Sequence, residues 1–328
     1  MKIGSIELGD KPLFLAPMED VTDPSFRFIC KKYGADVVYT EFISSDGLIR
    51  DAKTSLKKLD IFENERPVGI QIYGHILESM VEAAKIAEVA NPDIIDINFG
   101  CPVRKIATRG AGSGILNNVP LMVKITSEIV KAVKLPVTVK TRLGYDEDNK
   151  NILEITEQLQ DVGIKAITIH GRTRAQLYRG IADWTLIGEV KNNSRIKIPV
   201  IGNGDVNDPV QAKNLFSQYG VDGIMIARAT YGRPWIFKEI KYYLQYGELM
   251  PSLTLNEKAS LASTHLLKSI EVKGIPRGIF EMRRHLTNYF KNLPDFKETR
   301  IKLVTSLDVE ELLSIIVGIP EKFGNVNT

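Results

Sequence analysis

The sequence predicts an α/β fold, a (β/α)8 TIM barrel followed by a small C-terminal helical-bundle domain. Eight short apolar runs recur along roughly the first 245 of the 328 residues, and segments with helical periodicity lie between them. No strand-like run follows Gly247. Eight alternations of strand and helix imply parallel strands joined by right-handed crossovers, which is typical of this barrel. A doubly wound sheet is the structural alternative.

The eight runs are short and consist mainly of β-branched or other apolar residues. The segment after the third run places apolar side chains at i, i+3, i+4 and i+7, beginning with Leu77 and Met80, which is the spacing of a helix packed on a sheet. The predicted strands are Leu13–Ala16, Asp36–Thr40, Val68–Ile72, Ile94–Ile97, Val137–Lys140, Ala166–Ile169, Pro199–Ile201 and Gly223–Ile226.

The chain changes character after the last predicted strand. Met250-Pro251-Ser252 breaks the pattern, so we expect a linker over 248–254 between a barrel domain, 1–247, and a helical domain, 255–328. The helical part carries an apolar stripe, and cations recur every seven residues on another face. The stripe comprises Ile279, Met282, Leu286, Tyr289, Phe290 and Leu293, and the cations are Arg277, Arg284 and Lys291.

Positive charge is concentrated in the helical part. The net charge of the chain is only +3, but the segment from Gly274 to Val304 contains seven Lys or Arg residues and only three acidic residues. This segment is either a solvated helical face or a nucleic-acid contact surface. The chain has two cysteines and no apolar run near the roughly 20 residues of a membrane span, so we expect a cytoplasmic protein without a membrane role.

Polar residues follow nearly every predicted strand. The C-terminal ends of barrel strands face the active site, and buried polar atoms are costly without partners, so a large polar ligand should occupy this mouth. The residues at or just after the strand ends include Pro17, Met18, Glu41, Gln71, Asn98, Cys101, Lys140, Arg142, His170, Arg172, Asn203, Gly204, Asp205, Ala227 and Arg228.

The loops after strands seven and eight are suited to phosphate. Gly202-Asn203-Gly204-Asp205 frees backbone N–H groups, and Ala227-Arg228 supplies a cation before a helix expected near Gly232. Taken alone, the first of these motifs could be no more than a turn. The position of both loops in the barrel favours phosphate binding at this rim.

Lys140 should lie on the barrel floor, where a cation could stabilise negative charge on a reduced flavin. Gln71 and Asn98 could then hydrogen-bond the carbonyl edge of the ring. A structural alternative pairs Lys140 with an inward carboxylate such as Glu41. The segment Gly110–Gly114 has the wrong spacing for a dinucleotide fingerprint, so we expect a mobile loop at the mouth and no Rossmann domain.

The two cysteines and four histidines differ in their expected roles. Cys30 lies at helical spacing from Phe26 and Tyr33 and should fill the core. Cys101 follows a strand and precedes a proline, which favours a catalytic thiol, and no second cysteine accompanies it to suggest a metal site. His170 ends a strand and is a functional candidate. The other histidines, His75, His265 and His285, should be surface or packing residues.

Together these motifs closely resemble the tRNA-dihydrouridine synthases, and most of all their bacterial B-type branch. The likeness runs nearly end to end. The residues that carry it are Ala16-Pro17-Met18 with Thr22-Asp23, Gln71, Asn98-Phe99-Gly100-Cys101-Pro102 with Lys105, Lys140-Thr141-Arg142, His170-Gly171-Arg172-Thr173-Arg174, Asn203-Gly204-Asp205 and Gly232-Arg233-Pro234-Trp235.

The resemblance implies an FMN-containing barrel that uses NADPH, or NADH, to reduce the C5=C6 bond of a uridine in tRNA. The family's usual Gly-Arg near the phosphate is Ala227-Arg228 here, so the backbone approach there is expected to differ slightly. The positions implied to contact the cofactor are Pro17, Met18, Glu19, Gln71, Lys140, His170, Asn203, Gly204, Asp205, Ala227 and Arg228. His170 could instead contact the substrate.

By the same resemblance Cys101 is the general acid that protonates C5 of uracil, opposite to hydride transfer at C6. A general acid must be protonated, so we expect a neutral thiol. The target base must be extruded from tRNA, and phosphate contacts should offset that cost and depend on salt. The expected substrate contacts are Asn98, Lys105, Arg142, Arg172, Arg277, Arg283, Arg284 and Lys291.

Two other functions remain open at this point. A flavin barrel acting on a free pyrimidine, such as a dihydroorotate dehydrogenase, would not need a basic helical domain. A non-enzymatic tRNA-binding protein would leave Lys140, Gln71 and Cys101 without a role. No obligate protein partner is evident.

Overall fold

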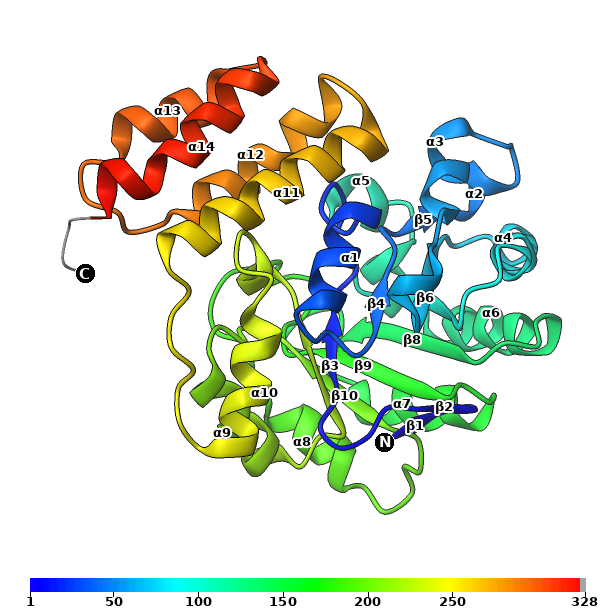
Figure 1. Ribbon diagram of the computed structural model, residues 1–328. Helices are drawn as coiled ribbons and strands as arrows, with labels where there is room; N and C mark the ends of the chain where they lie inside the picture. Colours follow the sequence, from blue (N-terminus) through cyan, green and yellow to red (C-terminus); the bar gives the residue numbers. More distant parts are fainter. Residues whose placement is uncertain (325–328) are drawn as a thin grey trace.

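The computed structural model describes residues 1–324 and contains a nearly closed parallel barrel (Figure 1). Its strands pair in the order β3-β11-β10-β9-β8-β7-β6-β4, and a parallel bridge between Phe14 and Val37 joins the two edges. The strands are β3 (Leu13–Leu15), β4 (Val38–Tyr39), β6 (Val68–Tyr73), β7 (Ile94–Asn98), β8 (Val137–Arg142), β9 (Ala166–His170), β10 (Val200–Asn203) and β11 (Gly223–Ile226). The eight predicted strands are confirmed, and sequential pairing excludes the doubly wound alternative.

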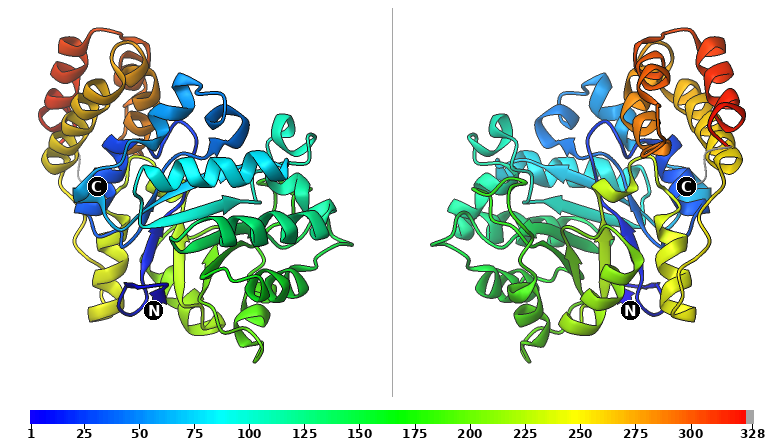
Figure 2. Two further views of the ribbon diagram at one scale, coloured as in Figure 1. Left: turned by 90° about the vertical axis from the view of Figure 1, so that its right-hand side faces the viewer. Right: turned by 90° about the vertical axis from the view of Figure 1, so that its left-hand side faces the viewer.

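Helices cover the outside of the barrel, as the predicted alternation requires (Figures 1 and 2). The predicted segment after the third strand is α4, in which Met80 and Ala84 are buried against the sheet. The longer helices are α1 (Pro24–Lys32), α4 (Leu77–Val89), α6 (Val119–Ala132), α7 (Ile152–Asp161), α8 (Thr185–Asn192), α9 (Pro209–Tyr219) and α10 (Ile236–Tyr246), and the short ones are α2 (Ser45–Leu48), α3 (Lys53–Leu56) and α5 (Arg104–Ala107).

Three short strands were not predicted. The antiparallel pair β1 (Lys2–Ile3) and β2 (Ile6–Glu7) lies at the end of the barrel away from the C-terminal helices (Figure 1), where Ile3 joins the apolar core inside the strands. The third, β5 (Ile43–Ser44), pairs with the end of β6. Strands of two residues carry no readable alternation of apolar and polar side chains, so sequence periodicity does not detect them.

Four C-terminal helices form a separate layer above the α1 side of the barrel (Figures 1 and 2). They are α11 (Leu255–Lys273), α12 (Arg277–Tyr289), α13 (Lys297–Thr305) and α14 (Val309–Phe323). The predicted apolar stripe faces their core, which also takes in Ile29 of α1 and Trp235 before α10. A capping box between Thr254 and Glu257 begins α11. The division into domains at 247 and 255 stays a prediction.

The predicted row of cations with a seven-residue spacing is wrong for its last member. Helix α12 ends at Tyr289, so Lys291 lies beyond the helix and cannot continue its face. The other two also differ in their surroundings, because Arg277 pairs with Glu281 whereas the Arg284 guanidinium lies over the ring of Tyr231. A periodic pattern read past a helix end no longer reports a shared face.

Helix α12 rests directly on a barrel loop at Gly232. This residue has φ +58°, and a Cβ atom there would lie 2.4 Å from the Tyr289 nitrogen and 2.5 Å from the His285 carbonyl oxygen. The Gly232 N–H also donates to His285 Nδ1 at 3.2 Å. A buried Lys273, paired with Asp23 at 2.9 Å, adds a second junction between α11 and α1.

Gly232→Ala is therefore expected to push α12 away from the barrel. The added methyl group meets backbone atoms, which cannot move aside by rotation, and the left-handed conformation disfavours alanine. We expect a loss of about 1–3 kcal/mol in the free energy of unfolding, measured by urea denaturation. Gly220→Ala serves as the control, because Gly220 has φ +64° with no atom near its Cβ position. Equal losses in the two variants would contradict the contact.

Low pH should destabilise the packing of the C-terminal helices through protonation of His265, a buried residue of α11. Burial lowers its pKa from 6.5 to about 4, so the folded protein holds this imidazole neutral, with its Nδ1 3.1 Å from the Tyr289 hydroxyl. The unfolded chain binds the proton near pH 6.5 and the folded chain does not, so stability falls as the pH drops below that value. Between pH 7 and pH 5 this one group should cost about 2 kcal/mol, measured by urea unfolding. His265→Gln should reduce the pH dependence; an unchanged slope would contradict the assignment.

No helix among residues 1–324 combines the length and the apolar character that crossing a membrane requires.

Candidate active site

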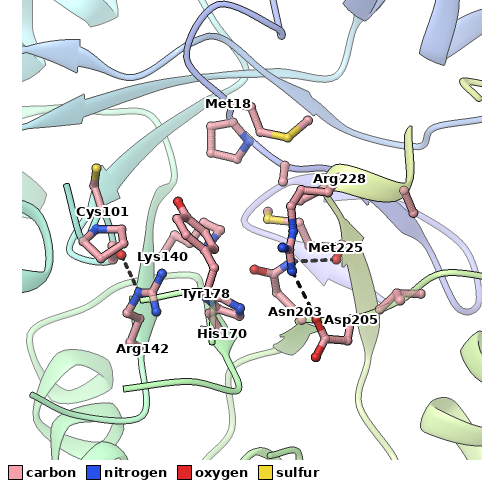
Figure 3. A pocket seen from close by; sticks show the side chains of 18 of the residues that line it. Met18, Cys101, Lys140, Arg142, His170, Tyr178, Asn203, Asp205, Met225 and Arg228 are labelled. Atoms are coloured by element: carbon pink, nitrogen blue, oxygen red, sulfur yellow. Dashed lines mark hydrogen bonds and ion pairs between the residues drawn. The ribbon is translucent and has the colours of Figure 1, made fainter. Parts of the chain in front are cut away.

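A pocket of about 400 Å³ opens at the C-terminal end of the barrel strands (Figure 3). In Figure 3, Cys101 and Arg142 lie on one side of it and Asn203, Asp205 and Arg228 on the opposite side. The structure thus brings together predicted site residues that lie at or just past the ends of seven different strands. Of the predicted site residues, those that line the pocket are Pro17, Met18, Gln71, Asn98, Cys101, Lys140, Arg142, His170, Asn203, Gly204, Asp205, Ala227, Arg228 and Arg284.

The Cys101 loop is held from both sides by hydrogen bonds. The Asn98 side-chain oxygen accepts from the backbone N–H groups of Gly100, at 3.0 Å, and Cys101, at 2.9 Å. Ser113 donates to the Cys101 carbonyl oxygen through its hydroxyl, at 2.9 Å, and its backbone N–H, at 3.0 Å. These contacts fix the backbone that carries the thiol at the pocket wall.

The expectation of a mobile mouth loop at Gly110–Gly114 is wrong. Gly112–Asn117 is a short 3-10 helix whose first three residues are buried beneath the Cys101 loop. A Cβ at Gly112 would lie 2.8 Å from the Cys101 carbonyl oxygen, and one at Gly114 would lie 2.1 Å from that of Ala107. The glycines are therefore needed for close packing behind the thiol, a use that their spacing alone does not reveal.

Cys101 is a neutral thiol in this setting. Only 8% of its surface is exposed, and burial raises the pKa of the thiol, although the Val103 backbone and the Arg142 and Lys140 cations act in the opposite direction. A raised pKa keeps the proton on sulfur at neutral pH. The group can therefore donate a proton, as a general acid must.

Lys140 places a half-buried ammonium group at the pocket floor. Burial and the neighbouring Arg142 lower its pKa to about 8, which still leaves it mostly protonated at pH 7. Within residues 1–324 it forms no ion pair. The alternative partner Glu41 instead accepts from the Asp20 N–H at 2.7 Å and lies 3.9 Å from Lys58. The Lys140 charge is thus left for a ligand.

Two amides beside Lys140 are oriented by a buried carboxylate. Gln71 donates to Asp96 at 2.6 Å and accepts from Asn98 at 2.9 Å. Burial raises the pKa of Asp96 to about 6, against the hydrogen bonds from Gln71 and Thr138. Each amide keeps one N–H without an acceptor in the described part of the chain, so both can donate to a ligand in the pocket.

Asp205 organises the opposite side of the pocket. Its carboxylate accepts from Arg172 at 2.6 and 3.0 Å, from the Ala182 N–H at 2.8 Å and from Arg228 at 3.2 Å. Burial acts to raise its pKa, but the Arg172 and Ala182 hydrogen bonds outweigh burial, so the pKa is lowered. Arg172 lies behind the pocket and positions Asp205, so the structure gives it a supporting position instead of the expected substrate contact.

His170 enters the pocket from the end of β9 as a neutral imidazole. Burial and the four surrounding arginine and lysine side chains lower its pKa well below the usual value. Its Nε2 lies 3.4 Å from the Arg172 guanidinium. A neutral ring can accept or donate one hydrogen bond to a ligand without adding charge.

The pocket rim contains aromatic residues that the sequence analysis missed. Tyr178 lies between two guanidinium groups, 5.6 Å from Arg142 and 5.4 Å from Arg228, and Figure 3 shows it over the middle of the pocket. Arg142 itself donates to the carbonyl groups of Gly100, Thr173 and Leu177, and so supports this loop. The missed residues with large side chains are Phe42, Tyr178, Met225 and Tyr231. A loop tyrosine has no periodic pattern that would identify it.

The remaining predicted residues lie outside this pocket. Glu19 pairs with Lys58 and lines a neighbouring hollow that also contains Lys105. Glu19 therefore does not line the pocket in which the cofactor is expected. Lys291 lines a second hollow between barrel and helices. Arg277 pairs with Glu281, and the Arg283 guanidinium lies over Phe280. A tRNA can also contact residues outside a pocket, so the expected contacts of these residues with tRNA stay predictions.

One cluster of acids occurs beside the pocket. Side-chain oxygens of Glu19, Asp20 and Glu41 lie within 4.8 Å of one another. Lys58 already pairs with Glu19 and reaches Glu41, which supplies positive charge to the cluster. The prediction that the chain has no metal site stays a prediction.

Comparison with known proteins identifies the family. The profile of the dihydrouridine synthase (Dus) family matches residues 14–316. The chain belongs to the dihydrouridine synthase family. A tRNA-dihydrouridine synthase B of Pseudomonas putida is 40% identical over 303 residues, 92% of this chain and 89% of that protein. The one from Shigella flexneri is 36% identical over 323 residues, covering 98% and 100%. The resemblance to the B-type branch is confirmed.

Comparison with solved structures shows other proteins of the same fold. A 2-naphthoyl-CoA reductase matches with a TM-score of 0.59 at 13% identity, covering 74% of this chain and 51% of that one. A morphinone reductase matches with a TM-score of 0.55 at 12% identity, covering 74% and 89%. At such identities the likeness concerns the fold, and it confirms the predicted barrel.

Proposed function

We propose that this protein reduces the C5=C6 bond of specific uridines in tRNA to give dihydrouridine, with FMN as cofactor and NADPH as reductant. The observation that carries the proposal is that one pocket contains both a neutral, buried thiol at Cys101 and a half-buried cation at Lys140 that forms no ion pair within residues 1–324. Family membership and the B-type relatives support the substrate class. Cytoplasmic tRNA is the expected substrate pool.

The donor set of the pocket fits a flavin mononucleotide. A partly desolvated ammonium without a carboxylate partner is costly unless a ligand supplies electron density. Half-buried Lys140 and the free amide N–H groups of Gln71 and Asn98 face one pocket. Arg228 and Gly204, on the opposite side, suit a phosphate. The residues that would hold the cofactor are Pro17, Met18, Gln71, Lys140, His170, Asn203, Gly204, Asp205, Ala227 and Arg228. When bound and reduced, FMN supplies hydride for C6 of uracil.

The residues of the chain perform the remaining tasks. Cys101 gives its proton to C5, and burial keeps that proton on sulfur until the base arrives. Asn98 fixes the Cys101 backbone, and Arg142 holds the Gly100 carbonyl oxygen at 2.7 Å, so the thiol keeps its direction. Lys105 and the predicted cations of the helical region, Arg277, Arg283, Arg284 and Lys291, would bind tRNA phosphates and offset extrusion of the base.

The test uses purified, FMN-loaded enzyme with NADPH and tRNA from cells that lack this protein. Mass mapping should locate new dihydrouridine in the tRNA, formed only when both reagents are present. Free dihydroorotate and orotate serve as the comparison, since a flavin barrel for free pyrimidines would turn them over. Turnover of the free pyrimidine without any change in tRNA would overturn the proposal.

A further inference from the structure

Arg284 lines the catalytic pocket although it belongs to helix α12 of the C-terminal region. The other cations that line the same pocket, Lys140, Arg142 and Arg228, come from the barrel. The Arg284 guanidinium lies 5.4 Å from the centre of the Tyr231 ring, and Tyr231 lines the pocket as well. The helical region therefore supplies part of the pocket rim.

The charge of Arg284 has no anionic partner within residues 1–324. By contrast, Arg228 pairs with Asp205 at 3.2 Å, and Arg142 donates to three backbone carbonyl groups. Arg277, on the same helix as Arg284, pairs with Glu281. Arg284 is exposed, so its charge is accessible to an anion that enters the pocket mouth.

The position of Arg284 is fixed by the junction at Gly232. Its neighbour His285 accepts the Gly232 N–H, and Tyr231, next to Gly232, packs against the Arg284 guanidinium. Two adjacent barrel residues thus hold two adjacent residues of α12. A side chain held in this way loses less conformational entropy when it binds a ligand.

We propose that Arg284 binds the phosphodiester group of the target nucleotide and so selects uridine within an RNA chain over free uridine. This inference rests on the proposed function. The Arg228 loop is the place for the cofactor phosphate, so a further cation at the same rim, without an anionic partner in residues 1–324, suits a second anion. An extruded nucleotide carries a phosphodiester group on each side of its ribose, which a free nucleoside lacks.

The test compares Arg284→Gln and Arg284→Lys with Arg300→Gln in FMN-loaded enzyme. Arg300 is an exposed residue of α13 that lines none of the hollows described above, so it controls for the loss of one charge in the helical region. Reduced enzyme is mixed with tRNA from cells lacking this protein, and flavin reoxidation is followed in a single turnover. Binding of the same tRNA is measured across a series of salt concentrations.

Arg284→Gln should slow reoxidation by tRNA at least about tenfold and reduce the magnitude of the salt slope of binding by about 0.7–1, the effect of one lost phosphate contact. FMN content and reduction by NADPH should not change. Arg284→Lys should restore most of the salt slope, because it keeps the charge, and Arg300→Gln should match the wild type in reoxidation rate. Circular dichroism confirms that each variant is folded.

Two results would overturn the inference while leaving the proposed function intact. Loss of FMN from Arg284→Gln would assign the residue to the cofactor phosphate. A wild-type salt slope and reoxidation rate in Arg284→Gln would show that no phosphate of the target nucleotide is bound there. Failure of the wild-type enzyme to form dihydrouridine would overturn both proposals. The measurement on wild-type enzyme tests this separately from the variants.

Discussion

Cys101→Ala is expected to lower the rate of uridine reduction in tRNA by about 10²–10⁴-fold, the usual contribution of a general acid. Reduction of the flavin by NADPH should stay within about twofold of wild type, because that step needs no proton from sulfur. The two rates are measured separately, by anaerobic flavin reduction and by single-turnover reoxidation with tRNA. Loss of both rates in FMN-loaded protein would contradict the assigned role.

Cys30→Ala is the matched control for this prediction. Cys30 is a fully buried residue of α1, and burial raises its pKa well above the usual value. The same atoms are removed, so the variant should lose stability while both rates persist. The pH dependence adds a second check, because burial raises the pKa of the Cys101 thiol. The reoxidation rate should therefore fall only at alkaline pH, as the thiol loses its proton.

The barrel could be predicted from sequence because its signals are local and repeated. Each buried strand is an apolar run, and the segments between them have helical periodicity, so neighbouring elements support one another. The pocket follows from the same pattern, since residues at the C-terminal ends of strands, such as Lys140 and Asn203, must meet at one face. Fourteen of the predicted site residues do line it, from Pro17 to Arg284.

What the sequence did not predict depends on contacts between distant segments. Arg172 follows a strand end as a site residue would, but only the fold shows that its guanidinium lies behind the pocket and pairs there with Asp205. Gly112 resembles part of a nucleotide-binding loop until its packing on the Cys101 carbonyl group is seen. The position of Tyr178 depends on the hydrogen bonds that Arg142 donates to the carbonyl groups of Thr173 and Leu177 in the loop that carries Tyr178. Composition and periodicity contain none of these relations.

Lys140→Met is expected to impair function and to stabilise the flavin-free protein. Removal of a preorganised cation that stabilises developing charge costs about 10²-fold or more in rate, so anaerobic reduction of the flavin by NADPH should slow by that factor. In the flavin-free protein the same cation destabilises the folded state. Burial and the Arg142 cation lower its pKa from 10.5 to about 8. This shift corresponds to about 3 kcal/mol of destabilisation at pH 7, where the unfolded chain binds the proton more readily.

Replacement by methionine, which fills a similar volume without charge, should therefore raise the free energy of unfolding of flavin-free protein by up to about 3 kcal/mol. The gain should shrink as the pH rises from 8 toward 10.5, because both states of the wild type then lose the proton. Lys191→Met is the control, since Lys191 pairs with Asp222 at 2.8 Å outside the pocket and should lose stability without slowing flavin reduction. A destabilised Lys140→Met with normal flavin reduction would make Lys140 a structural residue and remove the main support for a flavin at the barrel floor.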